Sequence, residues 1–170
     1  SDKIVKTING NDSNGLILLH GDMGTGKTSY IKYLLSVLDK EINYLPPDMT
    51  ANLSDPSFIE FLIEDLKNSV LIIEDADNIL KPREAGGSQA VSNILNISDG
   101  ILGDIINCTI ICTFNCPLDH IDKALLRPGR LIASYEFRQL ELDRTNVLLS
   151  KLYDGKYISD KPLSIAEIYN

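Results

Sequence analysis

The stretch Gly21-Asp22-Met23-Gly24-Thr25-Gly26-Lys27-Thr28 fits the phosphate-loop pattern, in which a glycine and four variable positions precede Gly-Lys-Ser/Thr. An apolar run at 16–19 comes before it and predicts a short buried strand, and apolar residues at helical spacing predict a helix over 29–40. A glycine-rich turn between a strand and a helix N-terminus binds phosphate, because backbone N–H groups and the helix dipole converge there. We therefore predict that a nucleotide is bound by Asp22, Met23, Gly24, Thr25, Gly26, Lys27, Thr28 and Ser29.

Two acidic residues follow a second apolar run and predict a magnesium and hydrolysis site. Glu74 and Asp75 come directly after the run at 70–73, which has the continuous apolar character of a strand buried on both faces of a parallel sheet. Open parallel sheets bind ligands at the carboxyl ends of their strands, so we expect these acids beside the phosphate loop. There they would hold Mg²⁺ and orient the attacking water, while Lys27 reaches the β- and γ-phosphates and the Thr28 hydroxyl binds the metal.

Asn115 and two arginines are further candidate site residues. Asn115 closes an apolar strand predicted over 108–114. An asparagine there is commonly a turn residue, but its amide could also hydrogen-bond the attacking water or the γ-phosphate. Arg127 and Arg130 begin and end a tight Arg-Pro-Gly-Arg turn. Such arginines commonly lie in a solvated loop, but their rigid guanidinium groups also suit phosphate recognition. The residues alone leave both interpretations open.

The composition is that of a globular protein, with 44% hydrophobic and 24% charged residues among 170. The net charge of −8 argues against an extended basic surface, so nucleic acid is not an expected partner. Cys108, Cys112 and Cys116 include no CxxC pair, which favours small buried residues in the cytoplasm or another reducing compartment. The apolar runs are too short to span a bilayer, and a membrane anchor outside this sequence is left open.

The rest of the pattern up to residue 139 predicts an α/β core. Strands are expected over 41–45 and 132–137, and a helix is expected to start at Asp55-Pro56 with the aspartate as its N-cap. Another helix is expected over 88–99, where Asp99-Gly100 supplies a stop signal. A polar loop is expected over 81–87.

The two ends of the chain differ in pattern from this core. Residues 1–14 are short of apolar pattern and are expected to be a lead-in. From Leu140 the pattern becomes helical, with Asp143 as the expected cap of one helix and Ser164 as the expected start of another. We therefore predict a P-loop core over 15–139 and the start of an incomplete helical lid over 140–170.

Together these motifs resemble the AAA ATPase module of the wider AAA+ group, over about residues 15–170. The stretch from Gly21 to Thr28 matches the family's Walker A motif, Ile72-Ile73-Glu74-Asp75 its Walker B motif, and Asn115 its sensor 1 position. The stretch from Ile121 to Arg130 is similar to the family's phrase IDPALLRPGR and is the most specific match. Residues 164–168, Ser-Ile-Ala-Glu-Ile, resemble the start of the family's second lid segment.

The resemblance implies a three-layer sheet of parallel strands in the order 5-1-4-3-2, followed by a helical lid. It implies Mg²⁺-dependent ATP hydrolysis, coupled to the remodelling or translocation of a protein partner. It also implies that Arg127 and Arg130 act on the nucleotide of a neighbouring subunit. The expected assembly is therefore a homo-oligomeric ring, with a hexamer as the expected size.

The order of the two Walker B acids departs from the common family pattern. That motif usually ends Asp-Glu, whereas this sequence has Glu74-Asp75. The same order occurs in the subgroup similar to the mitochondrial AAA protein that translocates a folded iron–sulfur protein. By position, Glu74 is expected on the metal side and Asp75 on the water side.

Two other functions fit parts of the sequence. A nucleotide-gated binding module with little hydrolysis is favoured by the short acid at Asp75, and a phosphate-release assay separates it from an ATPase. A DNA-linked AAA+ ATPase is opposed by the negative net charge, and salt-dependent DNA binding tests it.

Overall fold

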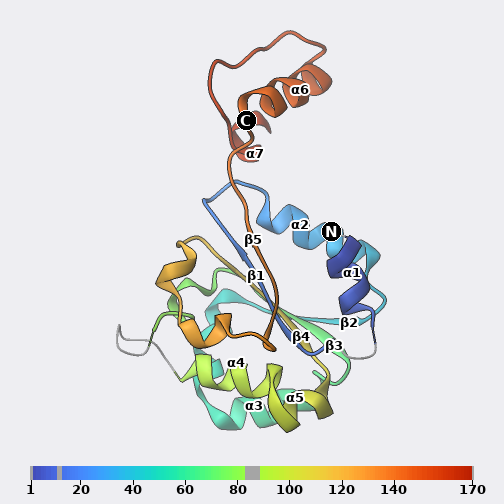
Figure 1. Cartoon of the computed structure of the whole chain (residues 1–170), viewed down its shortest axis with the longest axis vertical. Helices are drawn as coiled ribbons and strands as arrows, with labels where there is room; N and C mark the ends of the chain where they lie inside the picture. The colour runs from blue at the N-terminus through green and yellow to red at the C-terminus, as the bar shows by residue number, and fades with distance from the viewer. Residues whose placement is uncertain (1, 11–12, 83–88, 170) are drawn as a thin grey trace.

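Five parallel strands form the central sheet of the molecule. The computed structural model describes residues 2–10, 13–82 and 89–169, and its strand order is β2-β3-β4-β1-β5 (Figure 1). Every paired strand is parallel to its neighbour. The order is the expected 5-1-4-3-2 read from the other edge, so the predicted α/β P-loop sheet is confirmed. The strands are β1 (Gly15–His20), β2 (Glu41–Leu45), β3 (Ser69–Ile73), β4 (Thr109–Phe114) and β5 (Leu131–Glu136).

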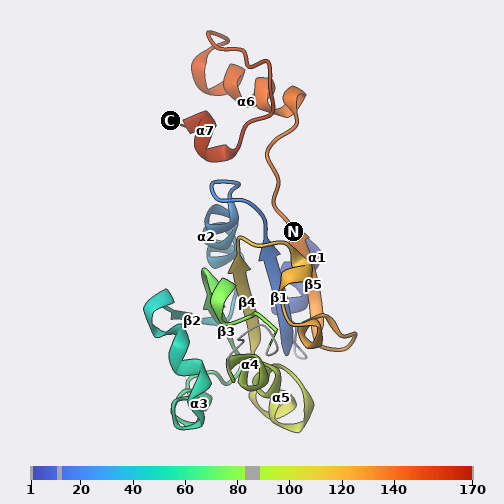
Figure 2. The same cartoon turned by 90° about the vertical axis from the view of Figure 1, so that its left-hand side faces the viewer.

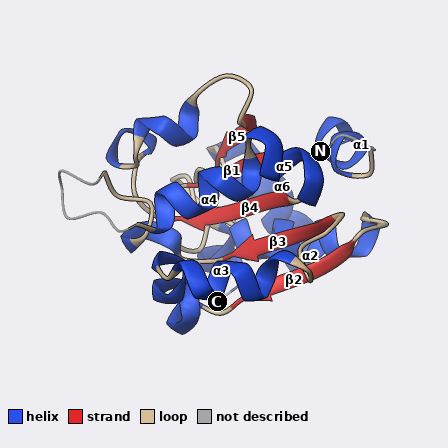
Figure 3. Ribbon diagram, turned by 90° about the horizontal axis from the view of Figure 1, so that it is seen from below, coloured by secondary structure: helices blue, strands red, loops and turns tan. Residues whose placement is uncertain are grey.

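Helices cover both faces of the sheet and make the fold three-layered. One face packs against α1 and α2, and the other against α3, α4 and α5 (Figure 2, Figure 3). The strand β1 serves both layers, because Ile17 points into the α2 side and Leu18 into the other. The helices are α1 (Asp2–Ile8), α2 (Lys27–Val37), α3 (Pro56–Ile63), α4 (Ala90–Ser98), α5 (Gly100–Ile106), α6 (Leu142–Tyr153) and α7 (Ile165–Tyr169).

Short 3-10 helices form several of the connections. They are η1 (Pro47–Ser54), η2 (Ala76–Asn78), η4 (Leu118–His120) and η5 (Lys123–Leu126). Both η2 and η4 follow directly after strands that end at the candidate site. The polar loop and the helix start expected over 81–88 fall mostly on residues 83–88, which lie outside the described residues.

Two helices lie where the sequence analysis expects none. Within the lead-in, α1 forms because Ile4, Val5 and Ile8 share one helical face, and Ile8 is fully buried on the α2 side of the sheet. After α4, Asp99 has the extended backbone of a helix stop (φ −151°, ψ 161°), as predicted. The same residue is also the N-cap position of α5, so the chain starts a new helix at once.

The predicted helix caps are right in one case and wrong in another. The Asp55 side chain accepts a hydrogen bond from the Ser57 backbone N–H at 2.9 Å and caps α3, as expected. The expected cap at Asp143 is wrong, because α6 already begins at Leu142 with Glu141 at the N-cap position. Asp143 lies in the first turn, where its charge still interacts favourably with the helix dipole.

The segment formed by α6 and α7 lies at one end of the molecule and returns toward the phosphate loop (Figure 1). Ser164 starts α7 as predicted: its hydroxyl accepts from the Glu167 N–H at 3.2 Å, and the Glu167 carboxylate accepts from the Ser164 N–H at 2.7 Å. The Ala166 N–H then donates to the Gly24 carbonyl at 3.0 Å. The phosphate loop is therefore in direct contact with α7.

Within the described residues, no helix has both the length and the apolar character that crossing a membrane requires.

Candidate functional site

The phosphate loop turns sharply between β1 and α2, and its glycines permit the turn. Gly21 has φ +130°, and a Cβ atom there would lie 2.0 Å from the Phe137 carbonyl oxygen. Gly26 has φ +103° and is the N-cap residue of α2. The N-terminus of this 11-residue helix therefore faces the end of the sheet, where its free N–H groups and its dipole favour an anion.

Lys27 lies along the inside of this loop. Its Nζ donates to the Gly21 carbonyl at 2.6 Å and to the Asp22 carbonyl at 2.9 Å, and the residue is only 8% exposed. Burial lowers the pKa of Lys27, and the nearby carboxylates of Asp75 and Asp77 oppose that shift. The ammonium group is thus held by two carbonyl oxygens of the loop at the point where phosphate would bind.

Thr28 and Glu74 face each other across the strand ends. The Thr28 hydroxyl donates to Glu74 Oε1 at 2.7 Å. Hydroxyl and carboxylate oxygens are ligands that Mg²⁺ prefers, and Mg²⁺ in nucleotide sites takes its other ligands from phosphate and water. Groups of three or more His, Cys, Asp or Glu suited to a metal are absent from the described residues. The pair Thr28–Glu74 therefore fits Mg²⁺ brought in with a nucleotide.

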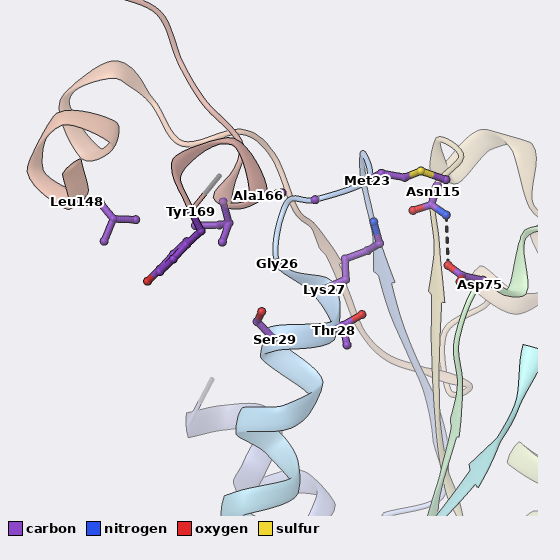
Figure 4. A pocket seen from close by; sticks show the side chains of 12 residues that line it. Met23, Gly26, Lys27, Thr28, Ser29, Asp75, Asn115, Leu148, Ala166 and Tyr169 are labelled. Carbon is purple, nitrogen blue, oxygen red and sulfur yellow. Dashed lines mark hydrogen bonds between the residues drawn. The ribbon is translucent and has the colours of Figure 1, made fainter. Parts of the chain in front are cut away.

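Asp75 points away from Glu74 and toward Asn115. It adopts a left-handed backbone conformation (φ 52°, ψ 43°), and its N–H donates to the Thr113 hydroxyl at 3.1 Å. Its Oδ1 accepts from the Asn115 amide nitrogen at 3.4 Å (Figure 4). The two neighbouring acids thus reach different partners, which is the separation that their positions predict.

Most of these residues border a cavity of about 740 Å³, and Glu74 is not among its lining residues. Lys27, Thr28, Asp75 and Asn115 line it from the sheet side, and Figure 4 shows Tyr169 of α7 and Leu148 of α6 on the opposite side of the opening. The cavity is therefore polar where β3, β4 and the phosphate loop end and more apolar along α6 and α7. Its lining residues are Met23, Gly24, Gly26, Lys27, Thr28, Ser29, Asp75, Asn115, Leu148, Ile165, Ala166 and Tyr169.

The structure treats the two candidate arginines differently and keeps both away from this cavity lining. Arg127 is exposed on the turn after η5. Arg130 is partly buried, forms an ion pair with Asp99, and donates from Nη1 to the Ala124 carbonyl at 3.4 Å. The family resemblance implies the same role for both arginines, whereas their environments in the structure differ.

Two polar residues near the site were missed by the sequence analysis. Thr113 is buried on β4, and its hydroxyl bonds the backbone of Asp75. Asp77 lies in η2 and accepts hydrogen bonds from the backbone N–H groups of Asn115 and Cys116. The signal for Asp77 in the sequence is that it is a third acid after Glu74-Asp75, in an acidic run that could also be a turn capping the next helix.

The sequence matches, over residues 17–139, the family described as ATPase family associated with various cellular activities (AAA). The chain belongs to the AAA family. The matched range runs from β1 past the end of β5 and includes the phosphate loop, Glu74, Asp75, Asn115 and both arginines. The family resemblance drawn from the motifs is thereby confirmed.

Individual relatives agree with this membership. An AAA-ATPase of Arabidopsis thaliana is 31% identical over 121 residues, which is 71% of this chain and 24% of the relative. The mitochondrial chaperone BCS1 of Homo sapiens is 30% identical over 125 residues, 67% of this chain and 29% of the relative. The vesicular-fusion protein SEC18 of Candida albicans is 32% identical over 136 residues, 67% of this chain and 17% of the relative. The chain thus spans less than a third of the length of each of these AAA relatives.

Proposed function

We propose that this chain is the Mg²⁺-dependent ATP-hydrolysing module of a ring-forming protein that remodels or translocates a protein partner. The observation that carries the proposal is the convergence of Lys27, Thr28, Glu74, Asp75 and Asn115 at one end of the sheet, beside a cavity of about 740 Å³. Membership of the AAA family supports ATP as the nucleotide.

Phosphate binding is assigned to the loop and to Lys27. The loop presents the N-terminus of α2, and Lys27 adds a full positive charge within reach of the loop carbonyls. When a phosphate enters, the Lys27 ammonium exchanges carbonyl partners for phosphate oxygens, which are stronger acceptors because they are charged. This exchange favours nucleotide over the empty loop.

Metal binding and water activation are assigned to different carboxylates. Thr28 and Glu74 would hold Mg²⁺, which neutralises phosphate charge when bound. Asp75 and Asn115 lie together on the other side and are positioned to orient the attacking water and accept its proton. Arg127 is exposed, so in a ring it is available to the nucleotide of a neighbouring subunit.

The proposal also covers the whole protein to which this chain belongs: its partner, its ring assembly and its cellular compartment. Relatives named as a mitochondrial chaperone and a vesicular-fusion protein support action on other proteins. The free thiols of Cys108, Cys112 and Cys116 support a reducing compartment. We propose a hexamer as the ring size on family resemblance, and a net charge of −8 makes DNA the less favoured partner.

The test is phosphate release by the full-length protein, with Mg²⁺ and with the metal chelated. We expect turnover that needs Mg²⁺ and that disappears in Lys27→Ala together with tight ATP binding, while the fold is retained. Lys32→Ala is the matched control, because Lys32 is an exposed lysine on the same helix α2. ATP binding without Mg²⁺-dependent release would favour the nucleotide-gated binding module instead, and unchanged ATP affinity in Lys27→Ala would reject the binding site.

A further inference from the structure

We propose that Asp77 is a positioning residue for hydrolysis, which holds Asn115 in its working orientation through the backbone and the side-chain amide. The inference rests on the proposed function, because it concerns the same site. It assigns a task to the third acid of the sequence Glu74-Asp75-Ala76-Asp77, which does not line the cavity.

The Asp77 carboxylate makes three contacts with the turn that follows β4. Its Oδ1 accepts from the Asn115 N–H at 2.9 Å and from the Cys116 N–H at 3.0 Å. Its Oδ2 faces the Asn115 side-chain nitrogen at 3.4 Å. A carboxylate that accepts two backbone N–H groups restrains a turn more strongly than a neutral acceptor does, because hydrogen bonds to a charged group are stronger.

The backbone around Asp77 is fixed from both directions. Asp75 adopts its left-handed conformation with its N–H bonded to Thr113, and this turns the chain into η2. Ala76 is 1% exposed and packs in the core, so η2 is anchored beneath the end of β4. Asp77 therefore cannot move away from the Asn115 turn without disturbing buried residues.

The contacts also select which end of the Asn115 amide faces the cavity. Both carboxylates, Asp75 Oδ1 and Asp77 Oδ2, lie 3.4 Å from the amide nitrogen. The two hydrogens of that nitrogen are thus directed to the acids, and Figure 4 shows the nitrogen toward Asp75 with the oxygen turned away from it. An amide oxygen accepts hydrogen bonds, so Asn115 is set to accept from water rather than to donate to the γ-phosphate.

The test is a double-mutant cycle in the full-length protein, measured as kcat and KM for ATP. We expect Asp77→Ala to lower kcat by about 10²-fold, the size typical of a misplaced catalytic group, with KM changed little. Asn115→Ala should lower kcat similarly, and the double variant should fall no further, because Asp77 acts through Asn115. Asp77→Asn keeps one oxygen for the two N–H groups and should restore part of the rate.

The matched control is Asp55→Ala, which removes an aspartate–backbone bond of 2.9 Å at α3 and should leave kcat unchanged. Unchanged kcat in Asp77→Ala, or an additive loss in the double variant, would overturn the proposal. A second readout is independent of hydrolysis: the Asn115 and Cys116 amides should exchange hydrogen at least about tenfold faster in Asp77→Ala, because they lose their acceptor. If the wild type hydrolyses nothing, the proposed function fails, and this exchange measurement still decides whether Asp77 holds the turn.

Discussion

Arg130 and Asp99 form an ion pair that ties the Arg-Pro-Gly-Arg turn to the junction of α4 and α5. Their side chains are 26% and 37% exposed, so the pair is shielded from solvent on several sides. Arg127, at the start of the same turn, is exposed. The structure therefore indicates a stabilising task for Arg130 within its own subunit and leaves Arg127 available to a neighbour.

We predict that Arg130→Ala lowers the free energy of unfolding by about 1–2 kcal/mol, because it removes a partly buried ion pair and the bond to the Ala124 carbonyl. Arg127→Ala should leave it within about 0.5 kcal/mol, as for ordinary surface changes. Urea unfolding of both variants measures the difference. Lys67→Ala is the control, since it removes an exposed pair with Glu64, and a loss equal to that of Arg130→Ala would contradict the prediction.

We further predict that Arg127 acts between subunits. Arg127→Ala should lower hydrolysis in the assembled full-length protein by about 10³ to 10⁵, the range known for arginine fingers, while ATP binding is retained. Mixed with Lys27→Ala subunits, which keep Arg127 but lose the phosphate ligand, it should recover activity above that of either variant alone. Lys123→Ala, at the exposed first residue of η5, should hydrolyse normally. A mixture no more active than its parts would count against action in trans.

The buried thiols make stability depend on alkaline pH. Burial raises the pKa of Cys112 to about 12 from its ordinary 9.0. The unfolded chain releases this proton above about pH 9 and the folded chain does not, so the unfolded state is favoured as pH rises. Between pH 9 and 10.5 the wild type should therefore lose about 1.6 kcal/mol more than Cys112→Ala does, because the slope rises from half to nearly all of the roughly 1.4 kcal/mol per pH unit that one proton contributes. Parallel unfolding curves for the two proteins over this range would reject the prediction.

The sequence predicts well those features that depend on neighbouring residues. The phosphate loop, the buried strands β1, β3 and β4 and the cap at Asp55 follow from local patterns, and the strand order follows from the family resemblance. Features that depend on contacts between residues far apart in the sequence were either missed or not distinguished from one another. Arg127 and Arg130 look alike in sequence, and only a partner 31 residues away distinguishes Arg130.

The same reason explains why the sequence predicts neither the helix α1 nor the contacts of Asp77. A helix as short as α1 is marginal alone and is held by packing Ile8 against the sheet. Asp77 acquires its partners 38 and 39 residues away only because Asp75 adopts a left-handed conformation that turns the chain under β4. An aspartate in this conformation is uncommon enough that sequence patterns rarely indicate it.

The two Walker B acids are expected to have different roles that substitution can separate. Glu74 receives the Thr28 hydroxyl bond, whereas Asp75 faces Asn115, so the two carboxylates serve different parts of the site. Asp75→Asn keeps the shape but removes the base, and should slow single-turnover hydrolysis by about 10² to 10⁴ with Mg-ATP affinity nearly intact. Glu74→Gln should instead weaken the dependence of ATP binding on Mg²⁺, because the metal side loses a charge.

Both variants are measured in the assembled full-length protein, by Mg-ATP affinity and by single-turnover hydrolysis, with Glu136→Gln as an acid-to-amide control on β5. Glu136 pairs with Arg138 outside the cavity, so its variant should match the wild type in both measurements. Normal hydrolysis in Asp75→Asn, combined with normal Mg-ATP binding but no cleavage in Glu74→Gln, would show that the roles are reversed. If neither variant changes the rate, hydrolysis does not take place at the end of β3, because removing the charge of either acid would then leave the reaction untouched.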